Sequence, residues 1–179
     1  MNVKSSSFLF AILVVVSGLC YSCQDIDPAK ASASVSKVSH AVLFEENFEP
    51  FPADVSAQSM DADSLRSEFF RAYHKQEYKS ALEALHFIEQ HDSVGQTLTF
   101  YRGVCRLSVN DPQSALDDFD KVLNPSGQPF EAEAKWYAAL AQMKSGNSME
   151  AAPLLEAIAN GPEGTFKKEQ AQSLLAAIH

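Results

Sequence analysis

The sequence has little cysteine: Cys20, Cys23 and Cys105 are the three in a chain of 179 residues. A disulfide-stabilised fold needs paired cysteines at close spacing, so we expect no structural disulfide here. Cys105 follows Val104 in a stretch with helical character, and we expect it to be a buried thiol. Stability must then come from an apolar core, which a chain of this length can bury.

Clusters of lysine and arginine are also missing. The chain has 14 basic against 23 acidic residues and a formal net charge of −9. Nucleic acids and anionic membrane surfaces recruit basic clusters, so neither is expected as a partner. The acidic balance is sufficient to explain solubility, and we infer no cationic partner from it.

Catalytic and metal-binding motifs are absent from the sequence as well. The five histidines have no second ligand at metal-binding spacing. No glycine-rich phosphate loop and no Gly-x-Ser-x-Gly turn occurs, and Cys105 has no histidine near it in sequence. We therefore expect a protein that is not an enzyme and that uses no cofactor and no metal. The histidines are His40, His74, His86, His91 and His179.

What the sequence does contain is an internal repeat. Similar stretches surround Ala81, Ala115 and Ala151, with the second alanine 34 residues after the first and the third 36 residues after the second. A period in this range is typical of helical-hairpin solenoids. Small residues recur because antiparallel helices approach closely only where small side chains face each other.

The repeat resembles the tetratricopeptide pattern over residues 62–179. The second unit matches best, with a small residue in its first helix and a small, an aromatic and a small residue in its second: Gly103, Ala115, Phe119 and Val122. The first unit departs from the pattern, because bulky Phe69 stands where glycine or alanine is expected. The resemblance implies an all-α fold, a right-handed α-solenoid of about three helical hairpins with a capping helix.

The expected helices follow from the apolar spacing. They cover 62–75, 77–92, 95–108, 112–124, 129–145, 148–160 and 165–178. We group them into repeats at 62–92, 95–124 and 129–160, followed by the capping helix at 165–178. That last helix has one apolar and one polar face, as the end of a solenoid requires.

The resemblance also implies a concave face lined by the first helix of each hairpin. An aromatic face of this kind suits an extended or apolar peptide or protein partner. Phe100 and Tyr101 stand where a carboxylate clamp would need polar residues, so no such clamp is expected. Any single one of these side chains could instead belong to the core. The predicted contact residues are Tyr73, Phe100, Tyr101, Trp136, Leu140 and Lys144.

The N-terminus has the pattern of an export signal. Lys4 precedes an apolar run at 8–16 that is shorter than the roughly 20 residues needed to span a bilayer. Residues 1–22 are predicted as a signal peptide, and Ser22 before Cys23 resembles the end of a bacterial lipoprotein signal, with Cys23 as the lipidated residue. Cys20 is an alternative site, and an ordinary signal or an uncleaved anchor also fits. We expect an exported protein in the bacterial envelope, anchored to a membrane (periplasm or outer membrane).

Two segments connect this signal to the repeats. Residues 23–41 lack an apolar period and are predicted to be a flexible tether. Residues 42–61 form an aromatic leader in which Pro50 and Pro52 favour extended backbone. The leader resembles those of some membrane-associated tetratricopeptide proteins of the Bacteroidetes group. It either lies in the concave face or covers the edge of the first hairpin.

Two functions fit the sequence. The first is a non-enzymatic interaction module or scaffold whose concave face binds a peptide or protein partner. The alternative is a structural or assembly-factor protein whose groove is filled by its own residues 42–52.

Overall fold

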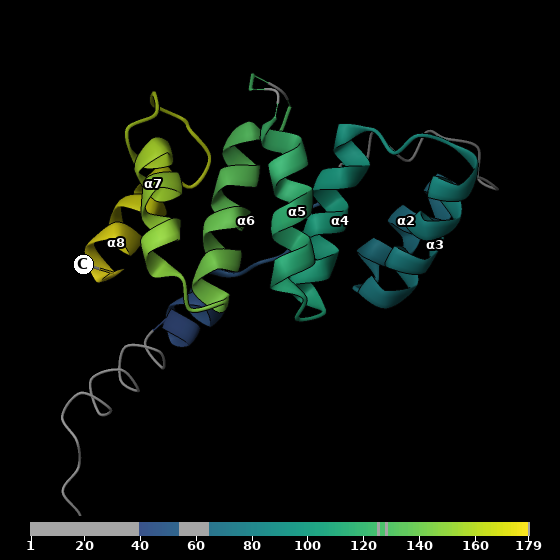
Figure 1. The fold of residues 1–179 in the computed structure, drawn as a ribbon, viewed down its shortest axis with the longest axis horizontal. Helices are drawn as coiled ribbons and strands as arrows, with labels where there is room; N and C mark the ends of the chain where they lie inside the picture. The colour runs from purple at the N-terminus through teal and green to yellow at the C-terminus, as the bar shows by residue number, and fades with distance from the viewer. Residues whose placement is uncertain (1–39, 54–64, 125, 128, 179) are drawn as a thin grey trace, which may run out of the picture.

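The computed structural model describes residues 40–53, 65–124, 126–127 and 129–178. These residues are helices, turns and connecting segments, with no β-strand among them. The helices labelled in Figure 1 are α2 (Leu65–His74), α3 (Tyr78–His91), α4 (Gln96–Ser108), α5 (Pro112–Leu123), α6 (Glu131–Lys144), α7 (Ser148–Ala159) and α8 (Lys168–Ile178). The all-helical prediction is confirmed for this part of the chain.

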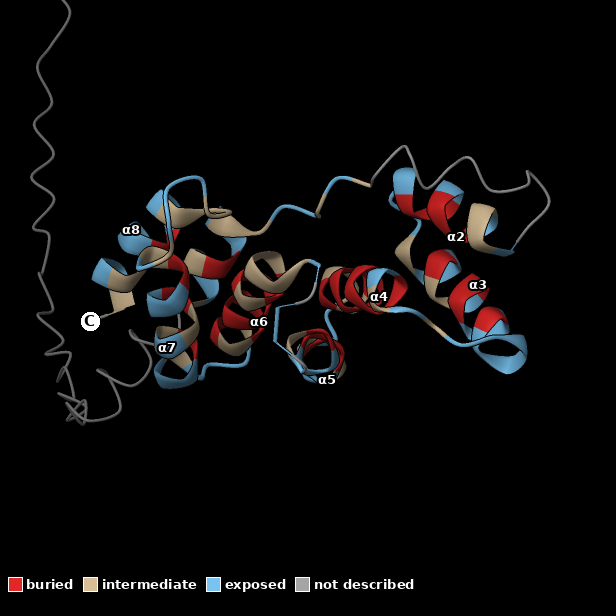
Figure 2. Cartoon of the chain, turned by 90° about the horizontal axis from the view of Figure 1, so that it is seen from above, coloured by how far each residue is buried: buried red, intermediate tan, exposed pale blue. Residues whose placement is uncertain are grey.

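The helices pack in a repeat-like way. Each of them contacts the next one along the chain, and α4 also contacts α6. Seen from above, α2, α4 and α6 form one layer and α3, α5 and α7 the other, and the residues coloured as buried lie mostly where the two layers meet (Figure 2). We call the exposed side of the first layer the inner face.

The same turn joins the two helices of each pair. Gln76, Asn110 and Gly146 all have positive φ, at 61°, 68° and 81°. The residue after each donates its N–H back across the helix end, as Asp111 does to the Arg106 carbonyl at 2.8 Å. This bond satisfies a carbonyl in the last turn of the helix and is typical of a helix that ends at a residue in left-handed backbone. Because these three residues have the spacing of the repeated alanines, the turn repeats with the sequence.

Small residues lie at the close helix crossings, as the repeat predicts. Ala81, Ala115 and Ala151 are fully buried. At Gly103 of α4, an added Cβ would lie 2.6 Å from a ring carbon of Phe119 in α5. Real Cβ atoms do not come that close to a ring, so the α4–α5 crossing depends on glycine at this position.

Two helices start later than the sequence predicted, each after a residue in left-handed backbone. Helix α6 begins at Glu131 instead of 129, because Phe130 has φ 67°. Helix α8 begins at Lys168 instead of 165, after Lys167 with φ 58°. Neither residue is a glycine, so the left-handed conformation could not be predicted from the residue type.

The prediction of an extended leader at 42–61 was wrong for its first part. Residues 40–47 are helical, and the Phe48 N–H donates to the Phe44 carbonyl at 2.8 Å. Proline restricts itself and the residue before it, so Pro50 and Pro52 leave residues 40–47 free to form a helix. Residues 48–53, after the helix, have no regular secondary structure. Residues 54–61 lie outside the described part of the chain.

The N-terminal predictions also lie outside the described residues. They are the signal at 1–22, the modification sites Cys20 and Cys23, and the tether up to residue 39. Within the described ranges, no helix has the length and apolar character that crossing a bilayer requires.

Candidate functional site

Residues 44–53 cross the inner face, and we call them the crossing segment. In Figure 1 this dark blue segment passes behind α6 and α5 toward α4, and in Figure 2 it runs over the first layer of helices. Its Glu49 accepts a hydrogen bond from α6, its Phe51 one from α2 and its Pro52 one from α4. The segment therefore touches the first helix of every helix pair.

The side chain of Phe51 is the centre of these contacts. It packs against five aromatic rings, mostly edge to face, with centroids 5.2 to 6.5 Å away. Pairs with this geometry add to the stability gained by burial. The five rings, which we call the ring cage, belong to Phe100, Tyr101, Phe130, Tyr137 and Phe166.

Three tyrosine hydroxyls hold the backbone of the segment. Tyr137 donates to the Glu49 carbonyl at 2.6 Å, Tyr73 to that of Phe51 at 2.6 Å, and Tyr101 to that of Pro52 at 3.1 Å. These three tyrosines come from α6, α2 and α4. Backbone beyond the helix has free carbonyls, and these bonds satisfy three of them.

Lysines meet the first half of the segment. The Lys144 ammonium lies 3.9 Å from the centroid of the Phe44 ring and 3.7 Å from a Glu45 carboxylate oxygen. Lys167 lies 3.9 Å from a carboxylate oxygen of Glu49. The glutamate side chains are largely exposed, so the ion pairs contribute little energy and mainly favour acidic residues at these positions.

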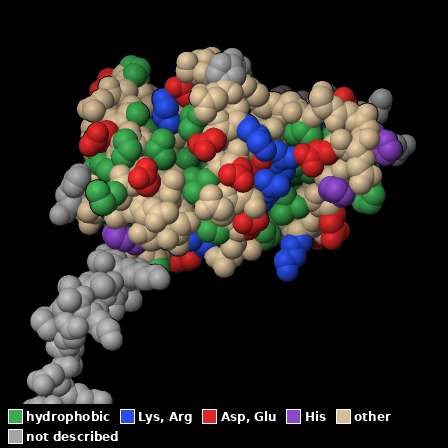
Figure 3. Space-filling view, viewed as in Figure 1, with side chains coloured by type: hydrophobic (Ala, Val, Ile, Leu, Met, Phe, Trp, Pro, Cys, Tyr) green, Lys and Arg blue, Asp and Glu red, His purple; other side chains and the backbone are tan. Residues whose placement is uncertain are grey.

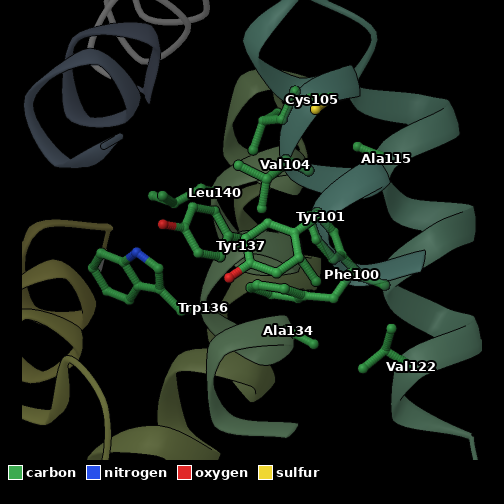
Figure 4. Packing of buried hydrophobic residues seen from close by; sticks show 14 of the residues in the cluster. Phe100, Tyr101, Val104, Cys105, Ala115, Val122, Ala134, Trp136, Tyr137 and Leu140 are labelled. Atoms are coloured by element: carbon green, nitrogen blue, oxygen red, sulfur yellow. The ribbon is translucent and has the colours of Figure 1, made fainter. Parts of the chain in front are cut away.

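The predicted contact residues divide into two groups. Tyr73, Phe100, Tyr101 and Lys144 contact the crossing segment. Trp136 and Leu140 form the second group and belong to the buried core, and Figure 4 shows the Trp136 ring on the side of α6 facing the yellow C-terminal helices, away from Phe100 and Tyr101.

Of the six predicted contact residues, five are buried, which is the alternative that the sequence left open for each of them. Lys144 is the one that keeps partial exposure. Side chains at 0 to 4% exposure cannot meet a partner while the crossing segment is in place. They are Tyr73, Phe100, Tyr101, Trp136 and Leu140.

Sequence reasoning missed Tyr137, although two signals could have found it. Tyr137 follows Tyr101 by 36 residues, the interval between Ala115 and Ala151. It also precedes Lys144 by seven residues, which places both on one side of a helix. The ring-cage residues Phe130 and Phe166 were missed because the sequence placed them within helices, whereas they lie just before α6 and α8.

Phe130 combines left-handed backbone with tight ring packing. Its ring stacks on Phe100 at a centroid distance of 4.8 Å and an interplanar angle of 5°. Left-handed backbone costs a non-glycine residue roughly 1 to 2 kcal/mol. Packing in the ring cage offsets this cost, so the strained residue is one that helps to enclose Phe51.

Burial changes the titration of several groups near the inner face. It raises the pKa of Tyr73 and Tyr137 above the usual range for tyrosine. It also raises the pKa of the Cys105 thiol to about 12. The hydroxyls therefore remain proton donors, and the thiol remains protonated and unreactive, at physiological pH.

A second polar cluster lies between the layers. Asp118 of α5 is fully buried and accepts two hydrogen bonds from Arg102 of α4, at 2.6 and 2.9 Å, and one from Arg106 at 2.6 Å. Arg102 also pairs with Glu89 of α3. Figure 3 shows basic side chains among acidic ones on this side of the molecule. The cluster joins three helices, and its charges compensate one another.

Among the described residues, no group of histidine, cysteine, aspartate and glutamate side chains could hold a metal ion. A shallow hollow of about 280 Å³ beside the start of α6 includes Lys135 and Glu131, which pair with each other at 2.6 Å.

No family model, curated protein or solved structure matches this chain.

Proposed function

We propose that the protein is a non-enzymatic scaffold of the tetratricopeptide type. Its fold is then a right-handed α-solenoid of three hairpins and a capping helix. The groove of this solenoid, its inner face, is filled by the protein's own residues 42–52. The support is the repeated turn at Gln76, Asn110 and Gly146 and the packing of each helix on the next. A filled inner face leaves the outer surface for a protein partner in the cell envelope. An open groove that binds a partner would require the segment to leave.

The observation that carries this proposal is the enclosure of Phe51. Its ring contacts side chains from α4 and α6 and from the residues just before α6 and α8. Its carbonyl accepts a hydrogen bond from Tyr73 of α2. One residue of the segment thus contacts all three helices of the first layer, as a built-in structural element would.

Replacement of Phe51 by alanine tests the proposal. Loss of a packed phenylalanine costs about 3 to 5 kcal/mol when it is fully buried. Because Phe51 is half-buried, we expect the free energy of unfolding to fall by about 2 to 4 kcal/mol in urea denaturation. The matched control is Phe87→Ala, since Phe87 on α3 is 53% exposed and should change stability by less than about 0.5 kcal/mol. Equal stability of the two variants would exclude a structural role for the segment.

Export and lipid anchoring form part of the proposal on sequence grounds. The apolar run at 8–16 and the Ser22-Cys23 pair support cleavage before Cys23 and acylation of that residue. Mass spectrometry of the mature protein from a bacterial envelope should find an acylated N-terminal Cys23. An unmodified N-terminus at any other residue would reject the anchor and leave the rest of the proposal standing.

A further inference from the structure

The inner face holds the crossing segment largely through groups that every peptide has. The three tyrosine hydroxyls donate to main-chain carbonyls, those of Glu49, Phe51 and Pro52. Recognition of carbonyls does not depend on which side chains the bound segment carries. These contacts would hold another extended peptide equally well.

Selectivity comes from two other features. The ring cage encloses one phenylalanine, and the Lys144 ammonium covers the ring of a second, Phe44. Lys144 and Lys167 lie opposite glutamates of the segment. A peptide that fits this face has two phenylalanines seven residues apart with acidic residues between them.

The segment is also placed so that it can be exchanged. It lies on the inner face and not between the two layers, and Phe48 and Phe51 remain half-buried, whereas Phe44 is buried. The side chains of Glu45 and Glu49 are 74% and 83% exposed, so their ion pairs contribute little to holding the segment. Its attachment to α2 through residues 54–64 gives it an effective concentration in the millimolar range. An external peptide therefore has to compete mainly with this high effective concentration, and less with the individual contacts.

We propose that residues 44–53 are a tethered resident ligand, which an acidic, phenylalanine-containing segment of a partner protein displaces from the inner face. This inference rests on the proposed function, in which the same segment fills the groove. It adds the chemistry of the partner and makes the resident segment autoinhibitory.

The test uses the full chain and a fluorescent synthetic peptide of residues 40–53 as the probe. In the wild-type protein the tethered segment competes with the probe. The variant Phe51→Ala weakens the resident segment, so we expect it to bind the probe at least ten-fold more tightly than the wild type in fluorescence anisotropy. The control Phe87→Ala should bind the probe as weakly as the wild type. Equal binding by Phe51→Ala and wild type would overturn the inference.

Altered probes test the chemistry of the ligand against the Phe51→Ala protein. A probe with alanine in place of Phe51 should lose binding by at least ten-fold, because nothing then fills the ring cage. A probe with glutamine at both Glu45 and Glu49 should bind about two- to five-fold more weakly at low salt, with the difference disappearing at high salt. Equal binding by all probes would mean non-specific adhesion and would reject the inference.

A cleavage variant covers the case in which Phe51→Ala does not fold. A protease site placed within residues 54–64 frees the segment from α2 while its sequence stays intact. After cleavage the labelled probe should replace the released segment, with binding at least ten-fold tighter than before cleavage. No gain on cleavage would overturn the inference.

Two further outcomes are informative. If Phe51→Ala lowers stability but no probe binds more tightly, the inference fails and the proposed structural role stands; if stability is unchanged, both fail.

Size-exclusion chromatography with light scattering should find a monomer. A dimer that exchanges segments would make a second copy the occupant and would overturn the role of a partner protein.

Discussion

Asp118 shows how much one buried residue can hold together. Its carboxylate accepts hydrogen bonds from Arg102 and Arg106 and is fully buried. A buried carboxylate is tolerated only when partners compensate its lost hydration. The sequence does not single out Asp118 among its acidic neighbours, because a one-dimensional pattern does not show which acid faces an arginine.

We predict that Asp118→Asn lowers the free energy of unfolding by about 3 kcal/mol, because Arg102 and Arg106 would lose the buried carboxylate they share and Arg102 would keep only the partly exposed Glu89 as a charged partner. Urea denaturation followed by circular dichroism measures this. The control is Lys121→Gln, which removes an exposed lysine 3.8 Å from the same carboxylate and should cost less than about 1 kcal/mol. Similar losses in the two variants would contradict the role given to the buried pair.

Cys105 makes a prediction about pH. Its folded pKa of about 12 lies above the unfolded value near 8.5, so the folded state binds this proton more tightly. The contribution to stability is complete below about pH 8.5 and is lost as pH rises toward 12. In a chain with Cys20 and Cys23 replaced by alanine, a thiol reagent at pH 8 should therefore modify Cys105 only as the protein unfolds in urea. Rapid modification of the folded protein would contradict this.

At the scale of the element, the α4–α5 crossing depends on Gly103. We predict that Gly103→Ala destabilises the protein by about 1 to 3 kcal/mol, because the new methyl group overlaps the Phe119 ring. Alanine would otherwise favour the helix by about 1 kcal/mol. Thermal denaturation of Gly103→Ala alone and with Phe119→Leu measures the effect, and the smaller leucine should remove part of the loss. An increase in melting temperature for the single variant would contradict the crossing geometry.

Most helices could be predicted from the sequence because their apolar residues recur at helical spacing. The errors lie where the conformation of a single residue determines where a helix begins. Phe130 and Lys167 delay two helices through left-handed backbone that is usually reserved for glycine or asparagine. Residues 40–47 were missed because the two prolines after them suggested extended backbone for the whole leader. The site was predicted in part: Tyr73, Phe100 and Tyr101 follow from the repeat, but Tyr137 and the ring cage depend on helix orientation.

At the scale of the whole molecule, the crossing segment connects helices that are otherwise joined mainly to their neighbours. Helix α2 packs on α3, and the rings of Phe70 and Tyr73 also reach Tyr101 in α4. The hydrogen bond from Tyr73 to Phe51 adds a link from α2 to a segment that also contacts α6. Repeat proteins unfold locally where links to the neighbouring repeat are weakest.

We therefore predict that Phe51→Ala loosens α2 and α3 more than α4 and α5. Amide hydrogen exchange followed by mass spectrometry should show a loss of protection of at least ten-fold in residues 65–91 and a smaller loss in residues 96–123. In the Phe87→Ala control, both regions should exchange as in the wild type. Uniform loosening of all helices in Phe51→Ala would mean that the segment stabilises the molecule without linking its ends.

The three hydroxyl-to-carbonyl bonds also limit how the molecule could grow. Within the four residues from Glu49 to Pro52, the segment accepts one hydrogen bond each from α6, α4 and α2. A duplicated helix pair inserted in the middle would separate these helices, and so few residues could no longer reach all of them. The length of a short peptide thus fixes the number of repeats that this architecture can accommodate, and any longer descendant would need a longer leader.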